Sequence, residues 1–263
     1  MHIVNSRLKT HKKYHINQEG FDSPPPNKKN INMNINITAP LSWNELSLRD
    51  LKHVAQVMML PEIDRTHASI LLFCKLAGLK MKKNLENTIF FKMGKQSFVL
   101  EPYQLMDFSQ KFAFIFEEKP CDIVNPTKID SHLIDVKFGD YYFANAMMMR
   151  YQFTGEKKFV RQALKALGQR TIYLSKMKGM MIWIWWTGVQ SYLQELYPLV
   201  FPKGGDNETD KTSYQILQDI FLMLNENRPQ ENKNIADSEL HSVLSALENK
   251  IEQYNREKEA LKK

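Results

Sequence analysis

Cysteine and long apolar runs are what this chain of 263 residues has least of. Its two cysteines, Cys74 and Cys121, stand 47 positions apart and belong to no CxxC motif. So few exclude a disulfide-rich scaffold and favour two reduced thiols in a cytosolic compartment. The most apolar segment, 179–189, is far shorter than the roughly 18 to 20 residues that a membrane-spanning helix needs. The first 30 residues contain no apolar stretch typical of a secretory leader, so we expect a cytoplasmic protein that does not bind a membrane.

Motifs for nucleotide and nucleophile chemistry are also missing. Gly94 and Lys95 lack the flanking residues of a phosphate-binding loop, and neither GxGxxG nor GxSxG occurs. The best polar cluster outside the termini is formed by Asp130, His132 and Asp135, and no nucleophile stands beside it. We therefore expect no catalytic residue and no cofactor, and we predict that the chain is not an enzyme.

Metal-ligand patterns are incomplete in the same way. No HExxH occurs, and the histidine pair four positions apart, at 11 and 15, falls in a polar tail. The acids at 206, 208 and 210 alternate like the start of an EF-hand loop. That loop would need glycine and glutamate where Lys211 and Leu217 stand, so we predict no metal site.

The N-terminal part reads as a tail. Residues 1–29 contain few aliphatic side chains and a run of three prolines, and such a segment cannot bury enough surface to offset its ordering entropy. In 30–38, NINMNINIT, apolar residues alternate with asparagine, which predicts a strand. The sequence therefore predicts a disordered, basic, asparagine-rich tail over 1–38, whose strand pairs either within the chain or with a partner.

A mainly α (α+β) fold is predicted for the body. Capping signals and apolar faces predict a helix–helix–hairpin–helix subdomain at 39–118, with its β-hairpin near 88–100 around Gly94. Two prolines interrupt 119–128, which reads as a linker. A helical subdomain follows at 129–203. Its segment GMMIWIWWTGV is apolar on all sides of a helix, which places that helix at the centre of the fold or in an interface.

The C-terminal region, 204–263, is predicted to be an acidic helical extension with a coiled-coil-like amphipathic helix at 238–262. Its apolar residues recur in steps of four and three, Lys258 interrupts the series, and the helix carries these candidate partner-binding residues: Leu240, Leu244, Leu247, Ile251, Tyr254 and Leu261. This stripe docks either on the chain's own body or on a second helix, from another copy or from a different protein.

Charge is unevenly distributed along the chain. Residues 1–35 carry a net +4, residues 36–204 a net +7 and residues 205–263 a net −4. The basic body makes nucleic acid a candidate partner, although lysine outnumbers arginine 28 to 8 and specific phosphate recognition favours arginine. Aromatic and basic residues also interleave over 137–161, as in single-strand binding surfaces, but the same aromatics fit the buried face of a helix pair.

Three stretches together carry a family resemblance: PLSWNEL at 40–46, the hairpin around Gly94, and WWTGVQSYLQELYPLVF at 185–201. Over roughly 38–202 the chain resembles a family of uncharacterised proteins encoded in phages and prophages of Bacteroidetes bacteria. The gene setting of that family implies virion or tail-assembly components with structural or chaperone roles. It implies a location in the bacterial cytoplasm or in the virion, and it supplies no functional residue.

Taken together, the sequence favours a non-enzymatic phage or prophage assembly protein that acts by docking on other proteins. The alternative is a nucleic-acid-binding accessory protein that uses the basic body at 36–204. A third reading is an enzyme whose site forms only in three dimensions.

Overall fold

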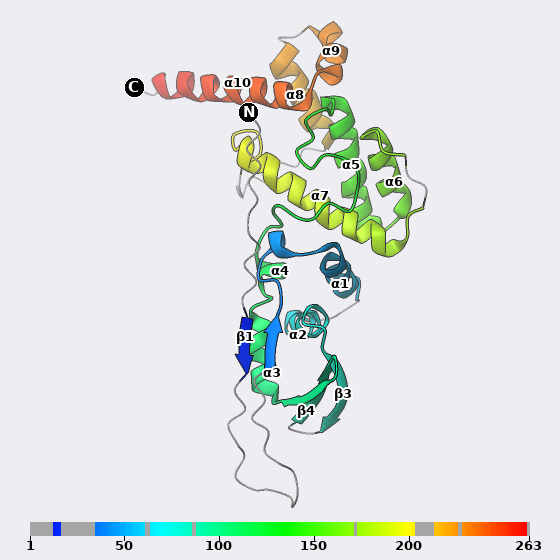
Figure 1. Ribbon diagram of the computed structural model, residues 1–263. Helices are drawn as coiled ribbons and strands as arrows, with labels where there is room; N and C mark the ends of the chain where they lie inside the picture. Colours follow the sequence, from blue (N-terminus) through cyan, green and yellow to red (C-terminus); the bar gives the residue numbers. More distant parts are fainter. Residues whose placement is uncertain are drawn as a thin grey trace, which may run out of the picture. The chain divides into compact units, whose positions relative to one another are not determined.

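The computed structural model describes residues 13–16, 35–60, 64–85, 88–170, 173–202, 213–225 and 228–261. The chain divides into two compact units, Met1–Glu118 and Lys119–Lys263 (Figure 1). The division coincides with the first residue of the predicted linker.

Part of the N-terminal tail is a small β-ribbon. Strand β1 (Lys13–Ile16) pairs antiparallel with β2 (Ile35–Thr38), and Ile16 stands opposite Ile35 in the register. The strand predicted at 30–38 is therefore described at 35–38, and it pairs within the chain. Its partner β1 lies within the segment 1–29 that the sequence predicts to be a tail. The rest of the predicted tail, 1–12 and 17–34, lies outside the described residues.

Two helices of the first unit begin at a side chain that caps them. Helix α1 (Leu48–Met58) starts at Ser47, whose side chain accepts from the amide of Asp50 while the Asp50 carboxylate accepts from the amide of Ser47. Helix α2 (Arg65–Leu76) is capped by Asp64. Helices α3 (Pro102–Gln110) and α4 (Phe114–Glu117), with the short 3₁₀ helix η1 (Trp43–Glu45), complete the unit.

The predicted hairpin is present as two strands of a three-stranded antiparallel sheet. Strands β4 (Thr88–Met93) and β5 (Gln96–Leu100) turn at Gly94, whose positive φ of 59° suits glycine. Strand β3 (Lys80–Leu85) pairs with the other edge of β4, with a bulge between Met81 and Lys83. The sequence does not predict β3, because its three lysines have low strand propensity and break the apolar alternation.

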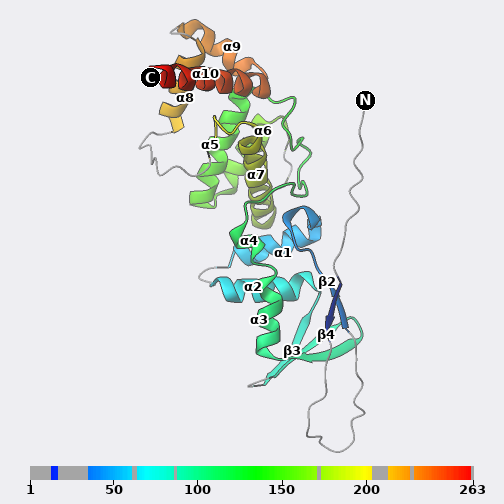
Figure 2. The same ribbon diagram turned by 90° about the vertical axis from the view of Figure 1, so that its left-hand side faces the viewer.

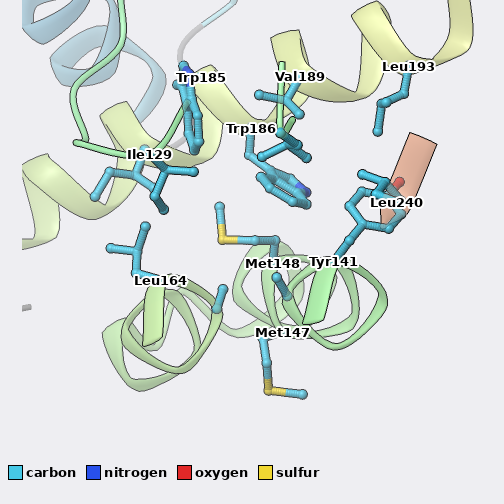
Figure 3. Packing of buried hydrophobic residues seen from close by; sticks show 14 of the residues in the cluster. Ile129, Tyr141, Met147, Met148, Leu164, Trp185, Trp186, Val189, Leu193 and Leu240 are labelled. Carbon is cyan, nitrogen blue, oxygen red and sulfur yellow. The ribbon is translucent and has the colours of Figure 1, made fainter. Parts of the chain in front are cut away.

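The second unit is built around helix α7 (Lys176–Leu196). Helices α5 (Phe138–Thr154) and α6 (Lys157–Ala166) form a pair joined at Gly155, and this pair packs on α7. Figure 3 shows Trp185, Trp186 and Val189 of α7 facing Met148 of α5, with Leu164 of α6 nearby. The segment before α5 is not helical, but Ile129 and Leu133 are buried in the same core, and Ile123 is buried against Gly188.

The C-terminal region belongs to this second unit. Helices α8 (Ser213–Asn225), α9 (Asn232–Asp237) and α10 (Leu240–Ala260) follow, with a 3₁₀ turn η2 (Pro229–Glu231) between α8 and α9. The amide of Leu240 donates to the carbonyl of Val136 at 2.8 Å, and the amide of Phe138 donates to the carbonyl of Ser238 at 2.9 Å. Two chain segments about 100 positions apart are thereby joined where α5 and α10 begin.

The predicted mainly α fold with one small β element is confirmed. The sheet has three strands where the sequence predicts two. In the described part of 204–263, the first half of α10 packs on the chain's own body, which is one of the two alternatives left open for the predicted stripe. Among the described helices, none is both long and apolar enough to cross a lipid bilayer.

We expect Leu244→Ala to destabilise the second unit by about 2–5 kcal/mol, because Leu244 is fully buried and its truncation leaves a cavity. Urea unfolding followed by tryptophan fluorescence measures the change. Tyr254→Ala on the same helix is the control, since an exposed side chain changes stability by less than about 0.5 kcal/mol. Equal effects of the two changes would contradict this packing.

Candidate docking site

Helix α10 is held firmly at its N-terminal end. His241 Nε2 lies 2.6 Å from the carbonyl oxygen of His132, and the Tyr197 hydroxyl lies 2.9 Å from His241 Nδ1. Because a carbonyl only accepts, Nε2 carries the ring proton, and Nδ1 is left to accept from the Tyr197 hydroxyl. Burial raises the pKa of Tyr197, so this hydroxyl stays protonated and able to donate.

An ion pair lies just ahead of the same helix. Lys137 Nζ donates to Asp237 Oδ1 at 3.0 Å, immediately beside the bridge that joins Lys137 to Glu239. This hydrogen bond lowers the pKa of Asp237 and raises that of Lys137. Both side chains are exposed, so the pair adds little stability, and that contribution is lost as the pH falls through the lowered pKa of Asp237.

Further along α10, two contacts tie its middle to the unit. The Glu248 carboxylate accepts from the amide of Leu199 at 3.2 Å, and Lys250 Nζ donates to the carbonyl of Met223 at 2.9 Å. Beyond Ile251, every described residue of the helix is exposed. Figure 1 shows the C-terminal half of α10 running out past α8 and α9, away from α5 and α7.

The six predicted partner-binding residues divide between these two halves. Leu240, Leu244 and Leu247 are buried against the chain's own helices, so docking within the chain accounts for them. Ile251 is half-buried at the transition. Tyr254 is 62% exposed and Leu261 is 88% exposed. The structure therefore leaves only the distal part of the predicted stripe available to another protein.

A pocket of about 420 Å³ opens beside the base of α10. Its walls come from α5, α7, α8, α10 and the 200–202 segment, and they are mostly apolar. The polar groups of Asn145 and Gln194 are engaged: Asn145 Oδ1 accepts from Trp186 Nε1 at 3.2 Å, and Gln194 Nε2 donates to the carbonyl of Pro202 at 3.3 Å. No Asp, Glu, His, Lys, Arg or Cys lines the described walls, and the titratable side chains among them are the phenols of Tyr141 and Tyr142. Burial raises the pKa of Tyr141, so its hydroxyl stays protonated at neutral pH.

The polar cluster of the sequence analysis lies on the surface of the second unit. His132 Nδ1 is 3.6 Å from Asp130 Oδ1, both side chains are about half exposed, and Asp135 is exposed. The nearby Ser131 Oγ accepts from Trp185 Nε1 at 3.0 Å. The cavity beside them is only about 30 Å³, the scale of one water molecule. Within the described residues, no three His, Cys, Asp or Glu side chains are grouped as a metal site.

The aromatic and basic residues between 137 and 161 do not form one surface. Phe138, Tyr141 and Tyr151 are buried in the core, so their rings are closed to a nucleotide. Phe159 lies between two cations within its own unit, with Lys158 Nζ 4.9 Å and the Arg150 guanidinium carbon 5.9 Å from the ring centre.

The two cysteines differ in exposure. Burial raises the pKa of the Cys74 thiol to about 11, so the thiol is protonated at neutral pH and is a poor nucleophile. Cys121 is exposed, and neither residue forms a disulfide.

No family model, curated protein or solved structure matches this chain. The interpretation of its function therefore depends on the geometry described above, and the most distinctive feature of that geometry is the divided helix α10.

Hydrogen exchange provides a direct check of this division. We expect amides of α10 up to about residue 250 to exchange slowly, because opening them requires disruption of the core, and those at 252–261 to exchange much faster. Mass spectrometry of peptides from the purified full chain measures the difference. Equal protection along the whole helix would contradict an exposed distal half.

Proposed function

We infer that this chain is a non-enzymatic assembly protein that docks on a protein partner through the distal half of α10. One observation carries the proposal: a single continuous helix is anchored in the core at one end and is exposed at the other. A helix held in this way presents its free turns in one orientation, so a partner binds it at a reduced cost in ordering entropy.

The distal seam has a defined chemistry. Ile251, Tyr254 and Leu261 follow the steps of three and four that mark one helix face, and Lys258 lies on the same face. On the flanks, Arg256 forms an ion pair with Glu252, and the neutral Gln253 donates to Glu257 at 2.9 Å, so these four side chains have partners within the helix. The fitting partner is an apolar groove that carries an acidic side chain opposite Lys258.

The length of the seam favours a larger partner over a second copy of this helix. The exposed turns, 252–260, span only about 14 Å at 1.5 Å per residue. Two such helices side by side would fall short of the roughly 1,200 Å² that stable interfaces bury. A groove that encloses the helix gains more contact area from the same few turns.

The proposed setting of this docking is virion or tail morphogenesis, as a structural component or chaperone, and its support is the sequence resemblance to phage and prophage proteins. The corresponding location is the bacterial cytoplasm, or the virion where the protein stays bound. The mostly apolar walls of the pocket and the surface position of the Asp130–His132 pair are in keeping with a non-enzymatic role.

If the partner is a different protein, the purified chain is a monomer. We expect static light scattering in moderate salt to give a mass near 30.9 kDa. A defined oligomer that dissociates in the Tyr254→Glu variant would contradict this expectation. It would show that the partner of the distal half of α10 is a second copy of the same chain.

Partner capture tests the proposal itself. We expect the tagged full chain, expressed in cells that produce particles, to recover a particle protein. Tyr254→Glu/Leu261→Glu should lower the recovery by at least ~10-fold, because two charges then enter an apolar contact. The matched control is Phe143→Glu/Phe153→Glu, which changes two exposed apolar residues of α5, 48% and 79% exposed, in the same way. Equal recovery with both double variants, or recovery of no particle protein, would refute the proposal.

A further inference from the structure

We propose that the exposed face of the β3–β4–β5 sheet binds single-stranded nucleic acid. This site lies in the first unit and shares no residue with α10. Its test therefore does not depend on whether the proposed docking through α10 is correct. From charge alone, the whole basic body at 36–204 is a candidate for binding nucleic acid. The structure narrows this candidate surface to one face of one sheet.

The sheet has a buried and an open face. Phe91, Phe98 and Leu100 are almost fully buried, and Figures 1 and 2 show α2 and α3 gathered on one side of the sheet. Side chains alternate along a strand, so Phe90 and Lys92 point to the other side. Phe90 is 37% exposed, which is unusual for a phenylalanine in the middle strand of a sheet.

The strand register places lysines around this ring. Lys83 stands directly opposite Phe90 on β3, and Lys80 stands opposite Lys92. Directly paired residues of antiparallel strands share a face, with Cβ atoms roughly 4.5–5.5 Å apart. On the other side of β4, Val99 pairs with Phe90 and Ser97 with Lys92. The open face therefore holds one aromatic ring with a lysine across from it and two more lysines one step along.

Between residues 39 and 118, positive charge is concentrated on this sheet. Residues 39–118 contain ten basic and nine acidic residues. Half of these bases fall within 80–95, which contains Glu86 as its one acid, and the three strands themselves contain no acidic residue. None of the five lysines in this segment forms an ion pair with a residue that the structure describes. Their charge is available to an anionic ligand.

Protection of a sheet edge explains part of this pattern but not all of it. Lysines on an edge strand discourage pairing with other chains, and Lys80, Lys82 and Lys83 lie on the edge strand β3. Lys92 and Phe90 lie on the middle strand β4, where both edges are already paired. An exposed ring beside a lysine at that position needs a different explanation.

The face matches the chemistry of an unpaired nucleotide. The Phe90 ring offers a stacking surface to a base, and the lysines lie where the neighbouring phosphates would run. A duplex hides its base faces, so it gains the electrostatic contribution but not the stacking. Lysine binds phosphate as a point charge and not with the planar fork of arginine, which predicts binding without strong sequence preference.

Fluorescence anisotropy with labelled oligonucleotides and the full chain tests this inference. The probes are dT20, rU20 and a 20-base-pair duplex, each titrated at several salt concentrations. We expect both single strands to bind more tightly than the duplex. Contact of Lys80, Lys83 and Lys92 with phosphates gives a slope of about −2 in a plot of log K against log salt concentration. The difference between dT20 and rU20 tells whether the ligand is DNA or RNA.

Two sets of variants separate charge from stacking. Lys83→Glu/Lys92→Glu should weaken dT20 binding at least ~10-fold and flatten the salt slope by about 1.4. Lys52→Glu/Lys176→Glu is the control, because it makes the same net charge change at exposed lysines on α1 and α7. Phe90→Leu should weaken binding ~10-fold and Phe90→Trp should restore it, because leucine keeps the apolar bulk and loses the stacking face.

Each other outcome overturns the inference. No binding, binding that does not change with salt, or equal affinity for the duplex would refute a single-strand site. If the sheet variant and its charge control lose the same amount of affinity for dT20, the binding depends on the overall charge of the chain and not on this sheet. The sheet variants leave the net +4 of residues 1–35 and the basic residues of 119–204 unchanged, so binding that survives them lies outside the sheet and contradicts the inference. Circular dichroism confirms that each variant is folded.

Discussion

The burial of α7 on all sides is the constraint on which the second unit depends. Trp185 and Trp186 are adjacent in sequence, so they diverge by about 100° around the helix and cannot face one common neighbour. Both are nevertheless buried, with their indole nitrogens donating to Ser131 and Asn145. A helix with apolar residues all round is stable only when several elements cover it. Helix α5, helix α6, the segment before α5 and the base of α10 provide that cover (Figure 3).

The N-terminal half of α10 is buried as part of this core. Leu240 and Leu244 of α10 fill the end of the core near Leu193 and Tyr141, and the backbone bridge at Val136 sets the direction in which the helix leaves. Beyond Ile251 its described residues are exposed, so none of the described elements covers them. The first half of the heptad pattern is therefore buried in the core, and the second half is exposed to solvent.

The first unit differs from the second because it contains a sheet, and helices cover only one face of that sheet. Phe91, Phe98 and Leu100 take the covered face, and the opposite residues of the same strands are left to the solvent. On most such sheets the open face is a mixture of small and charged residues. Here the open face has lysines on two adjacent strands beside an exposed phenylalanine, and the proposed single-strand site depends on that combination.

Local signals in the sequence determined much of this fold. The capping pattern at Ser47, the glycine turn at Gly94 and the apolar periodicity of α5, α6 and α10 depend on neighbours within a few residues, so they are readable without tertiary contacts. Strand β3 was not readable, because its lysines look like a solvated loop until β4 lies beside them. Which half of the stripe from Leu240 to Leu261 is buried, and which side of β4 faces solvent, were decided only by tertiary structure. Periodicity defines a face, and only the packed neighbours determine whether that face is covered.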